Sequence, residues 1–204
     1  MASHAHNKPT KLCFVTVGAT AAFTSLLLSV LDQSFLQALH QCGYTHLLVQ
    51  YGQDGSAMFE NFLVRYPPGD PGRHGLAIDG FDFNQEGLGQ EMRLAQASPP
   101  AGRNGGIIVS HAGSGSVLEA LRLGVPLVVV PNPSLKDNHQ EELAKELQKQ
   151  GYVVASHFKD VANAVGKAEA LRERMLTWPP VRGPNQRRRR TLEEVMSDEL
   201  GFLD

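Results

Sequence analysis

The chain has 204 residues, of which 42% are hydrophobic and 20% charged, and its formal net charge is −2. These values are typical of one globular domain with a hydrophobic core of normal size. The near-neutral charge excludes a nucleic-acid-binding protein that relies on its overall field, although Arg187 to Arg190 form a local basic cluster. No apolar run reaches the ~20 residues needed to cross a bilayer, and the polar start MASHAHNKPT does not resemble a signal peptide.

The two cysteines, Cys13 and Cys42, both lie in apolar surroundings. There is no CxxC pair and no Cys/His cluster in the sequence. We therefore expect two reduced, buried thiols in a reducing compartment, and no metal site.

Short apolar runs alternate along the chain with segments of helical periodicity. Strands are predicted at residues 12–17, 45–50, 78–83, 107–110, 127–130 and 153–156. Helices are predicted at residues 22–41, 54–64, 85–96, 114–123, 138–150 and 161–178. Turn residues predict loops at 66–77 and 98–106. Because the strands are continuous apolar runs, both sheet faces should be covered, which predicts an α/β fold with a Rossmann-like parallel sheet flanked by helices.

The end of the chain differs in composition from the rest. Residues 179–183 are rich in Pro and Gly and indicate a linker. Beyond it, Leu192, Val195, Met196 and Leu200 recur at helical spacing and predict a small amphipathic helix.

The turns that follow the first two strands carry polar or glycine residues where ligands bind in such sheets. Gly18 permits close backbone approach, and Thr20 offers a hydroxyl and a helix N-cap. A plain strand-to-helix turn explains the same residues. The side chain of Gln50, at the end of the second strand, is suited to a hydrogen bond with either a ligand or a backbone group.

The segment SHAGSGS, residues 110–116, joins a predicted strand to the start of a predicted helix. Free backbone N–H groups and the helix dipole favour an anion there. Gly113 and Gly115 allow close approach, while Ser114 and Ser116 add hydroxyl groups. Since neither a Walker lysine nor GxGxxG spacing is present, the segment predicts a diphosphate site without a P-loop lysine.

Glu119 and His111 each have two interpretations. Glu119 lies one helical turn after Ser116 and is suited to the hydroxyls of a ribose, but Ser116-x-x-Glu119 is also a capping box, which spacing alone favours. His111 is either a functional residue or a satisfied, partly buried imidazole.

A second polar loop opens the helix predicted at 138–150. It contains Asn132, Asp137, Asn138, His139 and Gln140. Asp137 alone is explained by an N-cap. Carboxylate, amide and imidazole groups together suit the hydroxyls of a sugar. The loops therefore predict a site for a nucleotide-sugar donor that needs no metal and no cofactor, if the helix N-terminus offsets the diphosphate charge.

Five motifs of the sequence closely resemble one known family. They are FVTVGAT (14–20), QYG (50–52), GFDF (80–83), SHAGSGS (110–116) and DNHQ (137–140). The family comprises the catalytic subunits of the eukaryotic UDP-N-acetylglucosamine transferase that makes dolichyl-diphosphate chitobiose, of glycosyltransferase family 28 type. The resemblance covers about residues 11–178 and departs from the family at residues 84–106 and at Ala19.

The resemblance implies a fold and an activity. Residues 11–178 would form the donor-binding C-terminal half of a GT-B glycosyltransferase, and residues 179–204 a linker and helix implicated in subunit association. A membrane-anchored, acceptor-binding partner subunit would hold the enzyme at the cytosolic face of the endoplasmic reticulum. The pair would transfer N-acetylglucosamine from UDP-GlcNAc to dolichyl-diphosphate-GlcNAc with inversion.

The resemblance also assigns roles to individual residues. Gly18, Thr20 and residues 113–116 would line the diphosphate, Glu119 would bind the ribose, Asp137, Asn138 and Gln140 the sugar, and Gly80 to Phe83 the region of the uracil. Asn132 joins the donor-binding set, and His111 and Glu119 are the candidate catalytic residues. The sequence offers no convincing general base; His111 and His139 are candidates on this chain, and the partner subunit is the other source. A complete two-domain GT-B enzyme needs about twice this length, so this chain either uses the second domain of a partner or acts without one. The competing hypothesis is therefore a stand-alone nucleotide-sugar-binding or epimerase-like protein.

Overall fold

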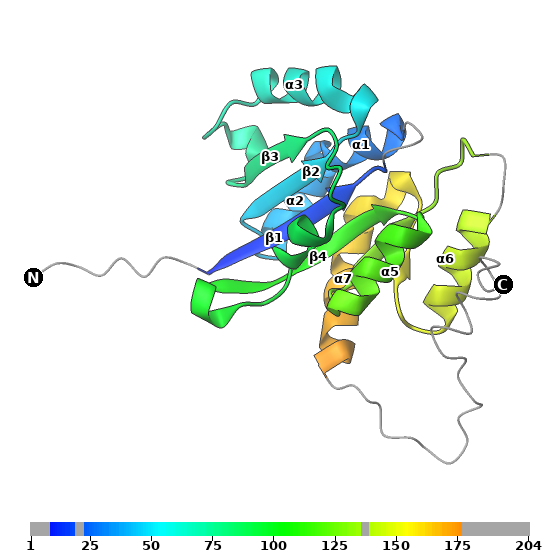
Figure 1. The fold of residues 1–204 in the computed structure, drawn as a ribbon. Coiled ribbons are helices and arrows are strands. Elements are labelled where there is room, and N and C mark those ends of the chain that lie inside the picture. Colours follow the sequence, from blue (N-terminus) through cyan, green and yellow to red (C-terminus); the bar gives the residue numbers. More distant parts are fainter. Residues whose placement is uncertain (1–8, 19–22, 136–138, 177–204) are drawn as a thin grey trace, which may run out of the picture.

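Six parallel strands form a single sheet in the computed structural model, which describes residues 9–18, 23–135 and 139–176 (Figure 1). The strand order is β3-β2-β1-β4-β5-β6, and every neighbouring pair is parallel. The strands are β1 (Thr10–Thr16), β2 (His46–Gln50), β3 (Ala77–Phe81), β4 (Arg103–His111), β5 (Leu127–Val130) and β6 (Val154–Ala155). The order reverses between β1 and β4, so the crevice beyond the carboxyl ends of these two strands is the expected ligand site.

Helices cover both faces of the sheet (Figure 1). They are α1 (Thr24–Val30), α2 (Gln33–Gln41), α3 (Ser56–Arg65), α4 (Gly89–Arg93), α5 (Ser114–Leu123), α6 (His139–Lys149) and α7 (Val161–Leu176). Side chains of α1, α2, α3 and α7 form one buried apolar cluster with the sheet, and those of α4, α5 and α6 form a second. The doubly wound α/β prediction is confirmed. Thr20, Asp137, Asn138 and residues 179–204 lie outside the described residues.

The single helix predicted at residues 22–41 is wrong, because two helices, α1 and α2, occupy this region. Asp32 stands between them and caps α2. Its Oδ1 accepts hydrogen bonds from the backbone N of Ser34 at 2.9 Å and from the Ser34 hydroxyl at 2.6 Å. An aspartate that bonds two residues ahead begins a new helix rather than continuing the old one.

The loop predicted at residues 98–106 is also wrong in its second half, since β4 begins at Arg103. Gly106 lies so close to β1 that a Cβ atom there would sit 1.8 Å from the Leu12 carbonyl oxygen. The β1–β4 register shifts at the same place, between Lys11 and Cys13. Glycine in this strand therefore permits close backbone approach at an irregularity, a use that composition alone does not distinguish from a loop.

At the amino-terminal end of the sheet, a polar network ties α7 to the strands. Glu169 accepts hydrogen bonds from Tyr44 Oη, Lys11 Nζ (3.1 Å) and Arg172 Nε (3.2 Å). Arg172 also donates to the Gly106 carbonyl at 2.6 Å. Burial works against the carboxylate charge, but the hydrogen bonds from Arg172 and Tyr44 outweigh it and lower the pKa of Glu169.

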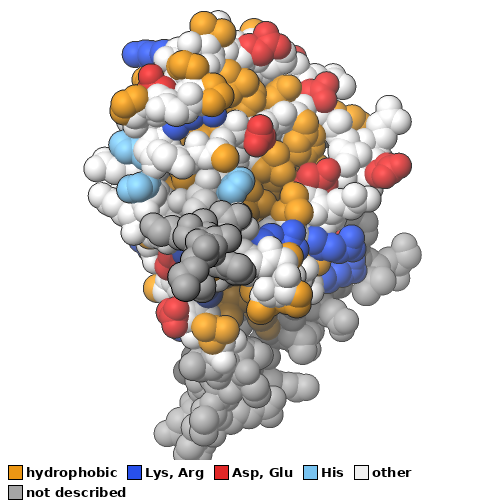
Figure 2. Space-filling view, turned by 90° about the vertical axis from the view of Figure 1, so that its left-hand side faces the viewer, with side chains coloured by type: hydrophobic (Ala, Val, Ile, Leu, Met, Phe, Trp, Pro, Cys, Tyr) orange, Lys and Arg blue, Asp and Glu red, His pale blue; other side chains and the backbone are white. Residues whose placement is uncertain are grey.

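Both cysteines are free, and Cys13 is fully buried while Cys42 is partly exposed. Burial raises the pKa of each thiol. On the face shown in Figure 2, acidic and basic side chains are spread around an apolar band, so neither sign dominates that face. None of the helices in the described part of the chain has both the length and the apolarity required to span a membrane.

Candidate functional site

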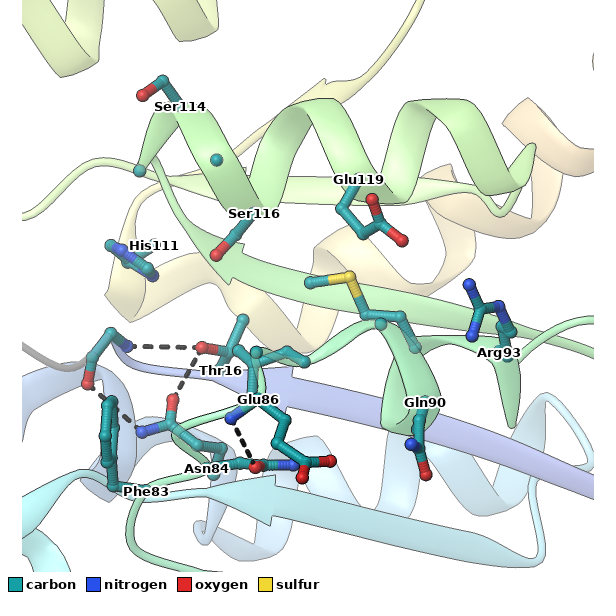
Figure 3. Close-up of a pocket in the computed structure, with 18 residues that line it drawn as sticks. Thr16, Phe83, Asn84, Glu86, Gln90, Arg93, His111, Ser114, Ser116 and Glu119 are labelled. Atoms are coloured by element: carbon teal, nitrogen blue, oxygen red, sulfur yellow. Dashed lines mark hydrogen bonds between the residues drawn. The ribbon is translucent and has the colours of Figure 1, made fainter.

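A cavity of about 760 Å³ lies where β1, β2 and β4 end (Figure 3). One wall comes from the strand ends and α5, and the other from the segment that leads into and forms α4. The first wall comprises Thr16, Gly18, Gln50, His111, Gly113, Ser114, Gly115, Ser116 and Glu119. The second comprises Phe83, Asn84, Glu86, Gly87, Leu88, Gly89, Gln90, Met92 and Arg93. The cavity therefore occupies the crevice at the sheet's point of reversal.

The N-terminus of α5 opens into this cavity. Gly113 is the N-cap, with extended backbone (φ −73°, ψ 126°), and no side chain among the described residues caps the helix. A Cβ atom at Gly115 would meet no atom within 4 Å. Uncapped N–H groups and the positive end of the dipole make this terminus suited to an anion.

The capping-box interpretation of Ser116 and Glu119 is wrong. Ser116 is the third residue of α5, so it lies inside the helix, whereas a capping-box serine must precede it. Figure 3 shows Ser116 and Glu119 directed from α5 toward the cavity, with Ser114 at its rim. Glu119 Oε1 lies 3.0 Å from the position of a Cβ atom at Gly89, so its carboxylate fills the space that a side chain on α4 would take.

The His111 imidazole lies between Gly18 and Gly113. A Cβ atom would lie 2.9 Å from His111 Nε2 if added at Gly18 (φ +90°), and 2.3 Å from it if added at Gly113. Its Nδ1 is buried and has no hydrogen-bond partner among the described residues. The satisfied-imidazole interpretation therefore holds only in part, because the ring also has a hydrogen bond to the Thr16 backbone. Burial lowers the pKa of His111, so the ring is neutral at pH 7 and supplies no fixed positive charge to an anion.

The buried Gln50 side chain hydrogen-bonds the backbone of two loops. It is 2% exposed, and its Nε2 donates to the carbonyl oxygens of Gly18 (3.3 Å) and Asp82 (2.8 Å). Its Oε1 accepts from Thr16 Oγ1 at 2.6 Å, and that hydroxyl also accepts from the Gly18 N–H. Gln50 thus joins the Gly18 turn to the loop after β3, which confirms the backbone-capping alternative.

Asn132 and Gln140 shape the loop between β5 and α6. The Asn132 backbone N donates to Gln140 Oε1 at 3.0 Å, and Asn132 Oδ1 accepts from the backbone N and the hydroxyl of Ser134. Neither residue lines the cavity, and His139 is exposed at the start of α6. The structure thus brings the 113–116 segment, Gly18, His111 and Glu119 together, and leaves Asn132 and Gln140 outside this group.

Sequence reasoning missed the α4 wall. Gly87 and Gly89 weakened the predicted helix at 85–96, which is reduced to the five residues of α4. The signal that could have found the wall is Met92, an apolar residue that is 1% exposed and packs in the core. Met92 also lines the cavity, as do its neighbours Gln90 and Arg93.

The two phenylalanines of GFDF differ in position. Phe83 lines the cavity, at the end near His111 (Figure 3). Phe81 does not line it and stacks on Phe14, with ring centroids 6.4 Å apart.

Few charged side chains line the cavity. They are Glu86, Glu119 and Arg93, and the described residues contain no group of three or more His, Cys, Asp or Glu able to hold a metal ion. Attraction of an anion to this cavity therefore depends on the N-terminus of α5 more than on basic side chains.

The sequence profile of the glycosyltransferase family 28 C-terminal domain matches residues 12–173. The chain belongs to this family. A relative, UDP-N-acetylglucosamine transferase subunit ALG13 of Eremothecium gossypii, is 35% identical over 83% of this chain and 86% of its own length. The motif-based resemblance is thereby confirmed.

Solved structures agree with the family assignment. An NMR solution structure of ALG13 superposes with a TM-score of 0.56 and 28% identity, over 79% of this chain and 84% of that chain. The crystal structure of MurG from Acinetobacter baumannii gives a TM-score of 0.51 at 21% identity, over 84% of this chain and 41% of that chain, which supports the fold alone. The predicted fold, that of the C-terminal half of a GT-B glycosyltransferase, is confirmed.

Proposed function

We propose that the chain is the donor-binding and catalytic subunit of a transferase that moves N-acetylglucosamine from UDP-GlcNAc to dolichyl-diphosphate-GlcNAc. The observation that carries the proposal is the uncapped N-terminus of α5, which opens into a cavity with Glu119 one helical turn further along. The name of the Eremothecium gossypii relative supports UDP-GlcNAc as the donor.

The diphosphate binds at the first turn of α5 in this proposal. The backbone N–H groups of residues 114–116 and the helix dipole offset its charge, and the Ser114 and Ser116 hydroxyls donate to its oxygens. Gly18 faces the diphosphate from the β1 turn. Glu119 accepts hydrogen bonds from the ribose hydroxyls, which lie one helical turn, about 5 Å, from the first phosphate contacts.

The sugar lies toward the loop between β5 and α6. Asn132, Asp137, Asn138 and Gln140 come from this loop, which follows the strand next to β4. The hydrogen bond between the Asn132 backbone and Gln140 supports the proposal, because it fixes the shape of the loop at one end. Carboxylate and amide groups suit sugar hydroxyls, since each hydroxyl both donates and accepts.

The reaction in this proposal is a single in-line displacement with inversion. The acceptor 4-hydroxyl oxygen forms a bond to the anomeric carbon, while the bond from that carbon to the diphosphate oxygen breaks. The leaving oxygen gains negative charge beside the α5 N-terminus, which stabilises the transition state without a cofactor.

The hydroxyl proton must pass to a general base. His111 is a neutral imidazole in the cavity, but its Nε2 faces two glycines, and among the described residues the lining carboxylates are Glu86 and Glu119. We therefore assign the base to the partner subunit, and to His111 and Glu119 the positioning and stabilisation of the donor.

A membrane-anchored, acceptor-binding partner completes the enzyme in this proposal and holds it at the cytosolic face of the endoplasmic reticulum. The support is that relatives which this chain covers over most of their length, such as the one in Saccharomyces cerevisiae at 92%, are named subunits. The lipid acceptor also requires a membrane contact, and no described helix of this chain could span a bilayer.

The test is a transfer assay with purified chain, UDP-GlcNAc and dolichyl-diphosphate-GlcNAc, with and without the co-purified membrane partner. The proposal predicts product only with the partner, and donor binding by the chain itself. Transfer by the chain alone would refute the divided enzyme. Failure to bind UDP-GlcNAc would refute the donor site, and conversion of UDP-GlcNAc to an isomeric nucleotide sugar would favour the epimerase-like alternative.

A further inference from the structure

We propose that Thr16 and Gln50 are positioning residues, which hold the carbonyl oxygen of Gly18 away from the diphosphate of the donor. The inference rests on the proposed function and deepens it, because it gives two buried polar side chains a role in binding the diphosphate. The observation that carries it is that both polar backbone groups of Gly18 are hydrogen-bonded to this pair.

The backbone at Gly18 depends on hydrogen bonds for its orientation. Its φ is +90°, a region that glycine enters freely, and it has no side chain that packing could hold in place. The Gly18 N–H donates to Thr16 Oγ1 at 3.3 Å, and the Gly18 carbonyl oxygen accepts from Gln50 Nε2 at 3.3 Å. These two bonds therefore set the directions in which the N–H and the C=O point.

The Gly18 carbonyl oxygen is directed toward β2. A Cβ atom added at Gly52, which follows β2, would lie 3.1 Å from this oxygen. β1 lies between β2 and β4 in the sheet, and α5 follows β4 along the chain. His111, at the end of β4, contacts Gly18 from that other side. A diphosphate at the N-terminus of α5 therefore meets the Gly18 turn without facing its oxygen.

The pair of side chains is buried and fully hydrogen-bonded. Thr16 is 0% exposed and Gln50 is 2% exposed. The Thr16 hydroxyl donates to Gln50 Oε1 at 2.6 Å, which leaves its oxygen free to accept from the Gly18 N–H (Figure 3). The same bond fixes the Gln50 amide, so that its two N–H groups face the carbonyl oxygens of Gly18 and Asp82.

The orientation of this oxygen matters because a carbonyl oxygen carries partial negative charge. Without its hydrogen bond, the Gly18 peptide could turn and place the oxygen toward the diphosphate, where the two would repel each other. We expect this repulsion to be similar in size to one hydrogen bond to a charged group, or about ten-fold in affinity. Uridine has no phosphate, so its binding would not change.

The test compares UDP and uridine binding to Thr16→Val and Thr16→Ser in the full chain. Titration calorimetry measures UDP affinity, and a titration of ¹⁵N-labelled chain measures the weaker uridine binding. Valine has nearly the shape of threonine but no hydroxyl, so Thr16→Val should bind UDP about ten-fold more weakly and uridine as the wild type does. Thr16→Ser keeps the hydroxyl and should bind both as the wild type does.

Two further variants separate positioning from stability. Gln50→Met leaves the Gly18 oxygen without its donor and should show the same selective loss of UDP affinity. Thr45→Val is the matched control, because Thr45 Oγ1 accepts from the Lys11 backbone N at 2.8 Å at the opposite, amino-terminal end of the sheet. Thr45→Val should lower the free energy of unfolding in urea and leave UDP affinity unchanged.

Unchanged UDP affinity in Thr16→Val and Gln50→Met, or equal losses of UDP and uridine affinity, would overturn the inference. Failure of both variants to fold would also overturn it, since the pair would then serve the fold alone. These results leave the proposed function standing, provided that the wild type binds UDP and Gly115→Ala weakens that binding. A wild-type chain that binds neither UDP nor UDP-GlcNAc would overturn the proposed function and this inference together.

Discussion

Gly115→Ala tests the anion site at α5 with little disturbance of the fold. Gly115 is the second residue of the helix, it is exposed, and a Cβ atom there would meet no atom within 4 Å. The substitution therefore adds one methyl group to the cavity and nothing to the core. Alanine is the better helix former, so the free energy of unfolding should stay the same or rise by up to about 1 kcal/mol.

The same methyl group would stand between a bound diphosphate and the first turn of α5. A hydrogen bond to a charged group contributes about 1.5–3 kcal/mol, so loss of one such contact predicts a fall in UDP-GlcNAc affinity of about 10- to 100-fold. Titration calorimetry measures the affinity, and urea unfolding followed by circular dichroism measures the stability.

Gly113→Ala provides the contrast. Its Cβ atom would lie 2.3 Å from His111 Nε2, so the imidazole must move, at a cost of about 1–3 kcal/mol in stability. Replacing His111 by alanine as well removes the clash, and the two changes should be strongly non-additive. Unchanged donor affinity in Gly115→Ala, with the helix intact, would refute the assignment of the diphosphate to α5.

Three further predictions follow from the contacts described above. Glu119→Gln should lower UDP affinity by about ten-fold and change stability by less than about 0.5 kcal/mol, because Glu119 is not a helix cap; a loss of stability without a loss of affinity would contradict this. Burial lowers the pKa of His111 below its ordinary 6.5, so protonation opposes folding. The loss in free energy of unfolding caused by protonation of His111 should therefore grow as pH falls below 6.5. Urea unfolding should show a weaker pH dependence of stability in His111→Gln. Glu169→Gln should cost about 1–2 kcal/mol at pH 7, discounted for partial exposure. The pKa of Glu169 is lowered from 4.5 in the folded chain. The difference in free energy of unfolding between Glu169→Gln and wild type should therefore be complete above pH 4.5 and disappear as pH falls through the folded-state pKa.

The sheet and the main helices could be predicted because periodicity reports burial directly. The runs at 107–110 and 127–130 are buried strands in the structure, and the helix predicted at 114–123 agrees with α5. The break between α1 and α2 was missed because apolar spacing continues through Asp32, whose carboxylate nevertheless starts a new helix. A local hydrogen bond at Asp32, which apolar spacing does not reveal, therefore separates α1 from α2.

The candidate site was predictable in part. SHAGSGS marked the strand-to-helix turn, and the structure gives its glycines different tasks. Gly113 makes room for His111, whereas Gly115 leaves open space in the cavity. This distinction depends on where the imidazole from β4 lies, which no local pattern contains. The α4 wall was missed for a related reason, since its glycine at 89 accommodates Glu119 from a distant segment and appears in the sequence as a helix breaker.

The most direct test of the central claim is a titration of ¹⁵N-labelled chain with UDP, followed through backbone amide resonances. We expect the largest saturable shifts to fall on Ser114, Gly115 and Ser116 at the N-terminus of α5. Saturable shifts confined to other parts of the chain, with residues 113–116 unchanged, would contradict it.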